Sequence, residues 1–595
     1  MVRDEDGGAD ADGVPAVPVG RVIGTEDATP LEFWVAVSDG QFLQLDDVVA
    51  LERTPPGRGP VRIYGVVSQV RARHEGARFD SDVFLIADGV LPAEISEAAF
   101  VQATRFEPEV FVPPLPGQLV RKATGAERDQ ALFFDEMRKS YKALPAGLTR
   151  DDEPLYLNLE FLDGTRGAHV NISGISGVAT KTTYAMFLLY SLFNSGVLGA
   201  DALNTKALVF NVKGEDLLFL DHANNQLTDE QRERYERLDL VPGAFRSVEV
   251  FAPPRRGDRN GAPDVAARAT GVMSFFWTLE QFCKERLLPF LFADAEDERQ
   301  QYTMVVHNVT ARLMEAQPLG EGGVVIEGAP VRTFQELVDV VTAKLSDEDP
   351  QEAARWAGRA IGAGTINAFI RRLQGAVDHV EHLIRADLPN PLDHQVRFDA
   401  QVSVVDLHNL NDRAKRFVVG VVLRKAFERK ERSGQAKPLQ FVVLDELNKY
   451  APREGTSPIK EILLDVAERG RSLGIILIGA QQTASEVERR IVANSAVRVV
   501  GRLDAAEASR GEYGFLPQVQ RQRATIIKPG TMIVSQPELP IPLVVQFPFP
   551  AWATRASEAG VAPSPPARAD RRDTTEVGRT ASDGMGDPFA GFPSP

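Results

Sequence analysis

The order of apolar and polar residues divides the chain into stretches of different texture. Between Val19 and Gln118, short apolar runs rich in Val, Ile, Phe and Trp are separated by turns rich in Pro and Gly. Runs of this kind at this spacing are typical of antiparallel strands. The pattern therefore predicts a small antiparallel β-barrel over residues 16–118, with strands at 20–24, 32–37, 61–67 and 82–87.

From residue 119 onward, fully apolar runs alternate with stretches of helical period, which predicts an α/β fold with a parallel sheet. The sheet is predicted in two parts, residues 119–265 and 396–549. Residues 266–395 show helical periodicity with almost no strand pattern, so we expect a helical insertion between the two parts. Strands of the sheet are predicted at 207–212, 402–407, 441–444, 474–479, 497–500 and 531–534.

Both ends of the chain have a composition that disfavours folding. Residues 1–15 are acidic, small and rich in Gly. Residues 550–595 are rich in Ala, Pro, Ser, Gly and Asp. Segments of this kind bury too little apolar surface to offset the entropy of ordering, so both are predicted to be disordered.

The overall composition is that of a globular protein, with 43% hydrophobic and 25% charged residues in a chain of 595. No apolar run approaches the roughly 18–20 residues of a membrane-spanning helix, and the acidic N-terminus is unlike a signal peptide. Cys283 is the single cysteine, which excludes an intrachain disulfide. We therefore expect a cytoplasmic protein without membrane association. The net charge of −16 argues against nucleic acid, but charge acts locally, and a basic channel can exist in an acidic protein.

A glycine-rich turn follows the predicted strand at 168–173 and opens an apolar helix. Backbone N–H groups in such a turn point at a phosphate, and a lysine reaches the outer phosphates of a nucleoside triphosphate. The usual pattern is G-x-x-x-x-G-K-[ST]. Here Ile175 and Thr180 stand where its glycines belong, which makes nucleotide binding a safer prediction than fast hydrolysis. The predicted nucleotide-binding residues are Gly174, Gly177, Val178, Ala179, Thr180, Lys181, Thr182 and Thr183.

A second apolar strand, 441–444, runs directly into two acids. Acids at strand ends often cap helices, but a buried strand that ends in two carboxylates after a phosphate loop is typical of a nucleotide triphosphatase. We predict that Asp445 and Thr182 hold Mg²⁺. Glu446 is predicted to orient and polarise the attacking water.

Three further polar residues have both a functional and an ordinary interpretation. Gln481 ends the strand that follows, where an amide can sense the γ-phosphate, although many such residues are simply at the surface. Arg471 stands at a helix C-terminus, where it either compensates the helix dipole or stabilises phosphate charge. Glu215 either touches the magnesium shell or belongs to a plain turn.

These segments together resemble the HerA branch of the HerA/FtsK hexameric DNA-translocating ATPases, over residues 19–547. The likeness is carried by the start of the barrel at 19–24, the Gly174 loop, the stretch 212–216 and the strand 405–407 with Leu410. The most specific block runs from Asp445 to Asn494 and includes 467–474 and Gln481.

The resemblance implies a RecA-like core with an N-terminal barrel of the HAS type, and ATP and Mg²⁺ as cofactors. It also implies a homohexameric ring around double-stranded DNA. Gln481 would then act as a sensor, and Arg471 would act on nucleotide, in its own or a neighbouring subunit. The chain departs from the family pattern at Thr180, at 447–448, at Ser472 and at 482–483.

Two functions fit these features. The preferred one is an ATP-driven translocase or helicase for double-stranded DNA, which works with a partner nuclease or effector that docks on the barrel. The alternative is an ATP-binding hexameric scaffold that assembles or restrains an effector with little motor activity. The intact Lys181, Asp445, Glu446 and Gln481 favour the motor. Thr180 and the acidic net charge favour the scaffold.

Overall fold

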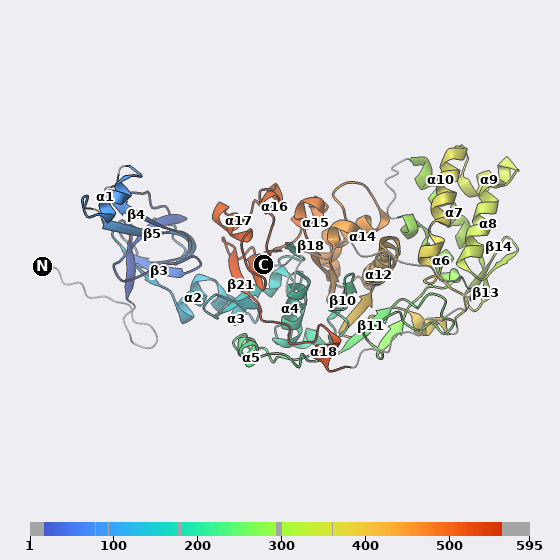
Figure 1. Cartoon of the computed structure of the whole chain (residues 1–595), viewed down its shortest axis with the longest axis horizontal. Helices are drawn as coiled ribbons and strands as arrows, with labels where there is room; N and C mark the ends of the chain where they lie inside the picture. Colours follow the sequence, from blue (N-terminus) through green and yellow to red (C-terminus); the bar gives the residue numbers. More distant parts are fainter. Residues whose placement is uncertain are drawn as a thin grey trace, which may run out of the picture.

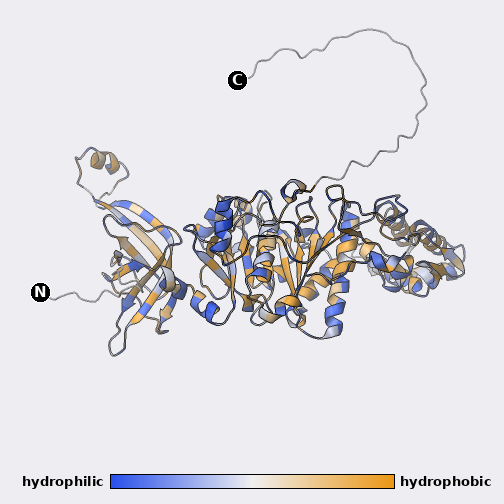
Figure 2. Ribbon diagram, turned by 90° about the horizontal axis from the view of Figure 1, so that it is seen from below, coloured by the Kyte–Doolittle hydropathy of each residue, from blue (hydrophilic) through white to orange (hydrophobic). Residues whose placement is uncertain are grey.

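The computed structural model describes residues 17–75, 77, 79–92, 94–175, 181–292, 300–359, 361–388 and 390–561. It is elongated, with the barrel at one end, a helical lobe at the other and a large mixed sheet between them (Figure 1). Figure 2 shows that the most apolar residues gather in the strands of the central sheet and in the helices against it. In the described ranges, no helix is long and apolar enough to cross a membrane.

Six strands close the barrel in the order β1-β2-β5-β4-β3-β6, and every neighbouring pair is antiparallel. Alternate residues such as Val35, Ile63 and Val101 are fully buried in its interior. The predicted barrel is therefore confirmed, but its last strand lies beyond the predicted boundary at residue 118. The strands are β1 (Pro18–Val22), β2 (Glu32–Val37), β3 (Val48–Arg53), β4 (Val61–Glu75), β5 (Glu94–Glu107) and β6 (Leu119–Lys122).

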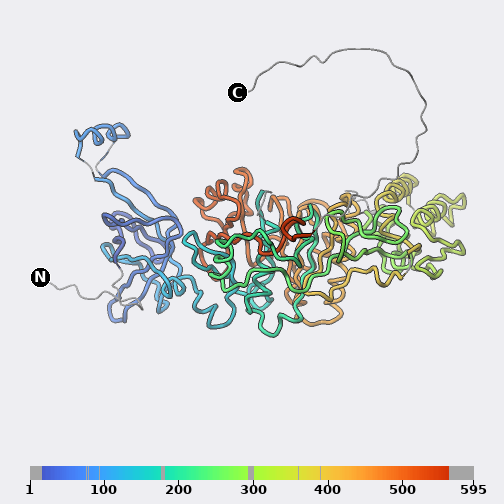
Figure 3. Tube along the Cα trace, turned by 60° about the horizontal axis from the view of Figure 1, so that its bottom comes forward, coloured from blue at the N-terminus to red at the C-terminus, as the bar shows by residue number. Residues whose placement is uncertain are grey.

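The strand predicted at 82–87 is wrong, because these residues form the short helix α1 (Asp82–Ala87). They lie at the end of the long β4–β5 hairpin, which projects from the barrel (Figure 3). At that position no neighbouring barrel strand is available for pairing. Asp82 also lies in the first turn of α1, where a carboxylate is favourable.

The central sheet has twelve strands. The neighbouring pairs from β12 to β19 are all parallel, and the pairs from β19 to β8 are antiparallel. In sheet order the strands are β12 (Val272–Ser274), β11 (Val248–Ala252), β16 (Val402–Asp406), β10 (Lys206–Asn211), β17 (Gln440–Leu444), β18 (Ile475–Gln481), β9 (Val170–Ser173), β19 (Val497–Val500), β20 (Thr531–Ser535), β21 (Leu543–Gln546), β7 (Ala143–Leu148) and β8 (Pro154–Asn158).

Both faces of the sheet are covered, because helices and strands alternate along this part of the chain. The face lined by Val170 and Ile478 packs on α4 (Lys181–Asn194). The opposite face packs on α12 (Asp412–Ser433) and α14 (Pro458–Leu473). The other helices of the core are α2 (Gly125–Ala131), α3 (Phe134–Lys139), α5 (Asp229–Glu236), α13 (Leu447–Tyr450), α15 (Arg489–Ala493), α16 (Ala505–Ala508), α17 (Gln518–Ala524) and α18 (Ala556–Ala559). In the core, 3₁₀ turns occur at Leu159–Phe161, Gly199–Leu203, Ala484–Glu486 and Gly511–Tyr513. In the insertion, they occur at Leu288–Phe292 and Pro391–His394.

The insertion between the two parts of the sheet is mainly helical, as predicted, but it also contains a small three-stranded antiparallel sheet that the helical prediction missed. The core also extends beyond the predicted boundary at residue 265, because β12 belongs to the central sheet. The elements of the insertion are α6 (Leu279–Lys284), α7 (Gln300–Met314), β13 (Gln317–Gly320), β14 (Gly323–Ile326), β15 (Ala329–Val331), α8 (Phe334–Leu345), α9 (Pro350–Ala357), α10 (Ala363–Gln374) and α11 (Val377–Val380).

The chain remains folded beyond residue 549, so the predicted disordered tail is wrong for residues 550–561. Trp552 is 1% exposed, and its ring lies 5.4 Å from Tyr190 and 5.2 Å from Phe245. It also forms an antiparallel β-bridge with Ala223. The prediction of disorder rested on the average composition of residues 550–595 and gave no weight to the single residue Trp552. The predicted disorder of residues 1–15 and 562–595 lies outside the described residues.

The fold class is therefore confirmed as α/β, with a mixed sheet that carries a mainly helical insertion and an N-terminal antiparallel barrel. One strand, β18, separates β9 from β17. The strand before the phosphate loop and the strand before the two acids are thus second neighbours in one parallel sheet. Their carboxyl ends point to the same edge, where open α/β sheets bind ligands.

Candidate nucleotide site

The site begins at the end of β9, where the sequence predicts the phosphate loop. Gly174 adopts φ +152°, and a Cβ there would lie within 3.1 Å of Arg502 O, so the position favours glycine. Its N–H donates to Gln481 O at 3.2 Å, and Ile175 N–H donates to Arg502 O at 2.7 Å. The start of the loop is thus fixed to β18 and to the segment after β19. The predicted binding residues Gly177, Val178, Ala179 and Thr180 lie outside the described residues.

Lys181 is the first residue of α4 and is 2% exposed. Its Nζ donates to Gly174 O at 2.6 Å, which brings the ammonium group under the strand end. Burial lowers the pKa of Lys181 to about 8, although the nearby carboxylate of Asp445 acts in the opposite direction. The negative charge of a bound phosphate would favour the protonated, positively charged form of Lys181.

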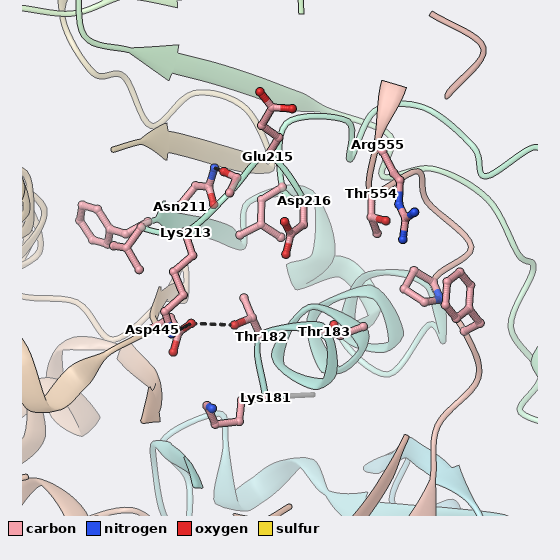
Figure 4. A pocket seen from close by; sticks show the side chains of 16 residues that line it. Lys181, Thr182, Thr183, Asn211, Lys213, Glu215, Asp216, Asp445, Thr554 and Arg555 are labelled. Atoms are coloured by element: carbon pink, nitrogen blue, oxygen red, sulfur yellow. Dashed lines mark hydrogen bonds and ion pairs between the residues drawn. The ribbon is translucent and has the colours of Figure 1, made fainter. Parts of the chain in front are cut away.

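Thr182 and Asp445 meet across the sheet edge, as the sequence predicts. The hydroxyl of Thr182 donates to Asp445 Oδ2 at 3.0 Å, and the Asp445 side chain is 7% exposed (Figure 4). A hydroxyl and a carboxylate are hard oxygen ligands of the kind that Mg²⁺ takes beside substrate phosphates. The donor set therefore fits Mg²⁺, with Thr182 and Asp445 as the protein ligands.

Glu446 follows at the turn into α13 and adopts the left-handed conformation, with φ +55°. Such a conformation is uncommon outside glycine and is found at functional positions. Its carboxylate lies 3.2 Å from Lys213 Nζ and 2.9 Å from Lys449 Nζ. Burial alone would raise the pKa of Glu446, but the two lysines outweigh burial and hold the pKa below its usual value.

A cavity of about 570 Å³ is lined by Lys181, Thr182 and Asp445, but not by Glu446. The start of α4 and Asp445 form its floor, and the segment after β10 forms one wall. The chain after β21 supplies another wall through Phe549, Pro550, Thr554 and Arg555. Figure 4 shows Lys213 extended toward Asp445, while Glu215 and Asp216 come from the same turn. Thr183 and Glu215, both named from the sequence, line this cavity.

Lys213, Thr554 and Arg555 are cavity residues that sequence reasoning did not name. In the stretch 212–216, the sequence pointed to Glu215 as a candidate and not to Lys213. The position of Lys213 directly after a strand of the parallel sheet could have indicated a site residue, because such turns lie at the edge where ligands bind. Thr554 and Arg555 carried no such signal, since they belong to a stretch whose composition indicates disorder.

Gln481 lies at the same edge, between the phosphate loop and the acids. Its side chain is fully buried, and its amide Nε2 donates to Asn171 Oδ1 at 2.8 Å. Its backbone carbonyl accepts the hydrogen bond from Gly174. Both ends of the residue are therefore held against β9, next to the first residue of the loop.

Arg471 lies at the opposite edge of the sheet. It precedes the amino end of β18, and its guanidinium donates to Gly164 O at 2.9 Å and to Thr165 O at 2.7 Å. These carbonyls belong to the loop before β9. Arg471 does not line the cavity of its own chain, so a role on nucleotide would require a neighbouring subunit.

No protein-family model and no curated protein matches the sequence. Among solved structures, VirB4 of Thermoanaerobacter pseudethanolicus is 16% identical over 68% of this chain and 96% of that chain, with a TM-score of 0.42. The plasmid coupling protein TrwB in complex with ADP and Mg²⁺ is 11% identical over 71% of this chain and 93% of that chain, with a TM-score of 0.42. The genome packaging NTPase B204 from Sulfolobus turreted icosahedral virus 2 is 11% identical over 25% and 69%, with a TM-score of 0.20.

Proposed function

We propose that the chain is an ATPase that translocates double-stranded DNA as a homohexameric ring of the HerA type. A nuclease or effector would dock on the barrel. The contact between Thr182 and Asp445, with the hydrogen bond from Lys181 to Gly174 O, carries the nucleotide part of this proposal. The ring, the DNA and the partner rest on the sequence resemblance.

The residues of the site divide the work of phosphoryl transfer. Lys181 stabilises the outer phosphates. Thr182 and Asp445 would hold Mg²⁺, which would supply positive charge beside the transferred group. Glu446 orients a water molecule and accepts its proton as the water oxygen attacks the γ-phosphorus. The bond from phosphorus to the bridging oxygen then breaks, and ADP leaves with the electron pair.

Gln481 has a positioning role in this proposal. Because its carbonyl is bonded to Gly174 and its amide to Asn171, a shift of the loop toward a γ-phosphate would move β18 with it. β18 in turn pairs with β17, which carries the two acids. Arg471 would act on the nucleotide of a neighbouring subunit.

The experiment that tests the motor is ATP turnover with and without linear duplex DNA, across a series of salt concentrations. The wild type should turn over ATP faster with DNA. The stimulation should fall steeply with salt, because DNA binding releases counterions. Glu446→Gln should abolish turnover while nucleotide binding persists. Asp412→Asn is the matched control, since Asp412 also lies near Lys449, at 3.7 Å, whereas Lys213 contacts Glu446 and Asp445.

A scaffold is the second candidate, and one observation favours it. The ion pairs with Lys213 and Lys449 lower the pKa of Glu446 and make it a weak base. A scaffold should bind ATP and form a ring, seen as a change of mass in solution, with no turnover in any condition. That result would reject the motor and retain the nucleotide site.

A further inference from the structure

Lysine side chains surround the two acids after β17. Lys213 reaches both acids, with its Nζ 3.4 Å from Asp445 Oδ2 and 3.2 Å from Glu446 Oε1. Lys449 binds the other oxygen of Glu446, and its second acidic neighbour is Asp412 rather than Asp445. Lys213 therefore bridges the predicted metal ligand and the predicted base.

Hydrogen bonds from Asn211 and Lys415 hold the backbone around Lys213 in place. Asn211, which is 1% exposed, donates its amide to Asp406 Oδ1 at 2.8 Å and to Gly214 O at 2.9 Å. Lys415 Nζ donates to Val212 O at 3.0 Å. The turn is thus fixed on both sides of Lys213, while the lysine side chain itself is 40% exposed in the cavity. The backbone at the base of the side chain is anchored, while the ammonium group is held only by its contacts with Asp445 and Glu446.

The ammonium group and a divalent cation would use the same oxygen. Asp445 Oδ2 accepts the Thr182 hydroxyl at 3.0 Å and faces Lys213 at 3.4 Å. A cation bound by Thr182 and Asp445 would lie close to this oxygen, and two positive charges at such a distance repel each other. Lys213 must then leave Asp445, and the cavity offers it the phosphates of the nucleotide as a new partner.

We propose that Lys213 acts as the counter-ion of Asp445 and Glu446 while no metal is bound. When a divalent cation binds together with nucleotide, Lys213 leaves Asp445 and the cation takes its place. This inference rests on the proposed nucleotide site. Together with Lys449, Lys213 offsets the charge of the two acids, so that the negative phosphates can approach them without metal. The metal adds comparatively little affinity as long as Lys213 is present.

The test is the affinity for ADP and for a non-hydrolysable ATP analogue, measured by calorimetry on the full chain. Each protein is titrated once with excess Mg²⁺ and once with EDTA, and the readout is the ratio of the two dissociation constants. When metal is absent, the phosphates in Lys213→Met meet Asp445 without the ammonium group of Lys213, while Glu446 keeps its contact with Lys449. The ratio should therefore rise about tenfold over the wild type, mainly through weaker binding in EDTA.

Two further variants separate this role from a general loss of charge or of structure. Lys213→Arg keeps the positive charge and should restore a ratio close to that of the wild type. Lys449→Met removes a lysine that contacts Glu446 but not the metal ligand, and should change the ratio less than about twofold. Lys213→Gln replaces the methionine variant if that protein does not fold.

An unchanged ratio in Lys213→Met and Lys213→Gln would overturn the proposal, as would an equal change in Lys449→Met. Affinities that fall by the same factor with and without Mg²⁺ would also overturn it, because they would indicate a structural role for Lys213. A wild type that binds neither nucleotide in either condition would instead reject the proposed function, and this inference with it.

Discussion

Two cavities of similar size, both lined by lysines, arginines and acids, lie in different settings. The nucleotide cavity, of about 570 Å³, lies at the carboxyl edge of the parallel sheet. The second cavity, of about 650 Å³, lies between the barrel, the segment around α2, and the chain from Arg523 to Gln546. Volume and charge alone would rank the two equally as ligand sites.

The difference lies in what the acids contact. In the cleft beside the barrel, Asp47 binds Lys122 at 2.9 Å and Arg150 at 3.3 Å, while Asp46 binds Arg523 at 2.7 Å. Arg150 and Arg523 come from the core, and both aspartates belong to the barrel, so these pairs join the two parts. In the cavity beside α4, Asp445 instead faces the hydroxyl of Thr182 and the half-exposed Lys213. The acids of the cleft connect the barrel to the core, whereas the contacts of Asp445 stay within the core and suit the proposed nucleotide site.

The largest effect should come from Lys181→Ala. Loss of a buried ammonium group that faces phosphate should weaken ATP binding about a hundredfold. The midpoint of thermal unfolding should not fall, because a buried charge is itself costly to the fold. Binding calorimetry and a thermal scan measure the two effects. If Lys528→Ala, on the wall of the barrel cleft, weakened ATP binding equally, the distinction between the two cavities would be lost.

Asp445→Asn and Asp47→Asn should have opposite consequences. Asp445→Asn should remove the effect of Mg²⁺ on nucleotide affinity at little cost in thermal stability, because its partner Lys213 keeps its contact with Glu446. Asp47→Asn should leave nucleotide affinity intact and cost about 1–2 kcal/mol of stability, because Lys122 and Arg150 lose their partner. Equal losses of stability in both variants would contradict the comparison.

Asp46→Asn should have the smallest effect near neutral pH. Burial raises the pKa of Asp46 and outweighs the attraction of Arg523. The native state therefore keeps the proton to a higher pH than the unfolded chain, and the stability that Asp46 contributes is lost as pH rises through its raised pKa. Relative to the wild type, Asp46→Asn should gain thermal stability as the pH rises through this range. Thermal scans at several pH values measure the trend, and a trend in the opposite direction would show that Arg523 dominates.

The elements that sequence patterns predicted well are the buried strands of the sheet. The run 402–407 became β16 and the run 441–444 became most of β17, because an unbroken apolar run between helices has one stable place in an α/β fold. The meeting of Thr182 with Asp445 followed from the same logic, since parallel strands end at one edge. The place of Arg471 also follows from it, because a residue just before a parallel strand lies at the opposite edge.

Contacts between residues far apart in the sequence could not be predicted from local patterns. Nothing near Lys213 in the sequence reveals that its partners lie more than 200 residues away, at Asp445 and Glu446. The run 82–87 has the composition of a strand, but its position at the tip of a hairpin leaves it nothing to pair with. Trp552 is one aromatic residue in a polar stretch. Its burial depends on the packing of its ring against Tyr190 and Phe245, which lie more than 300 residues earlier in the chain.

The wall that the chain forms after β21 has a practical consequence. Thr554 and Arg555 line this cavity, although they lie far along the chain from the strands that carry the predicted metal ligand and phosphate loop. A deletion or insertion within residues 550–555 would therefore change the wall of the cavity. Variants that differ in this stretch should not be treated as the same protein when their nucleotide affinities are compared.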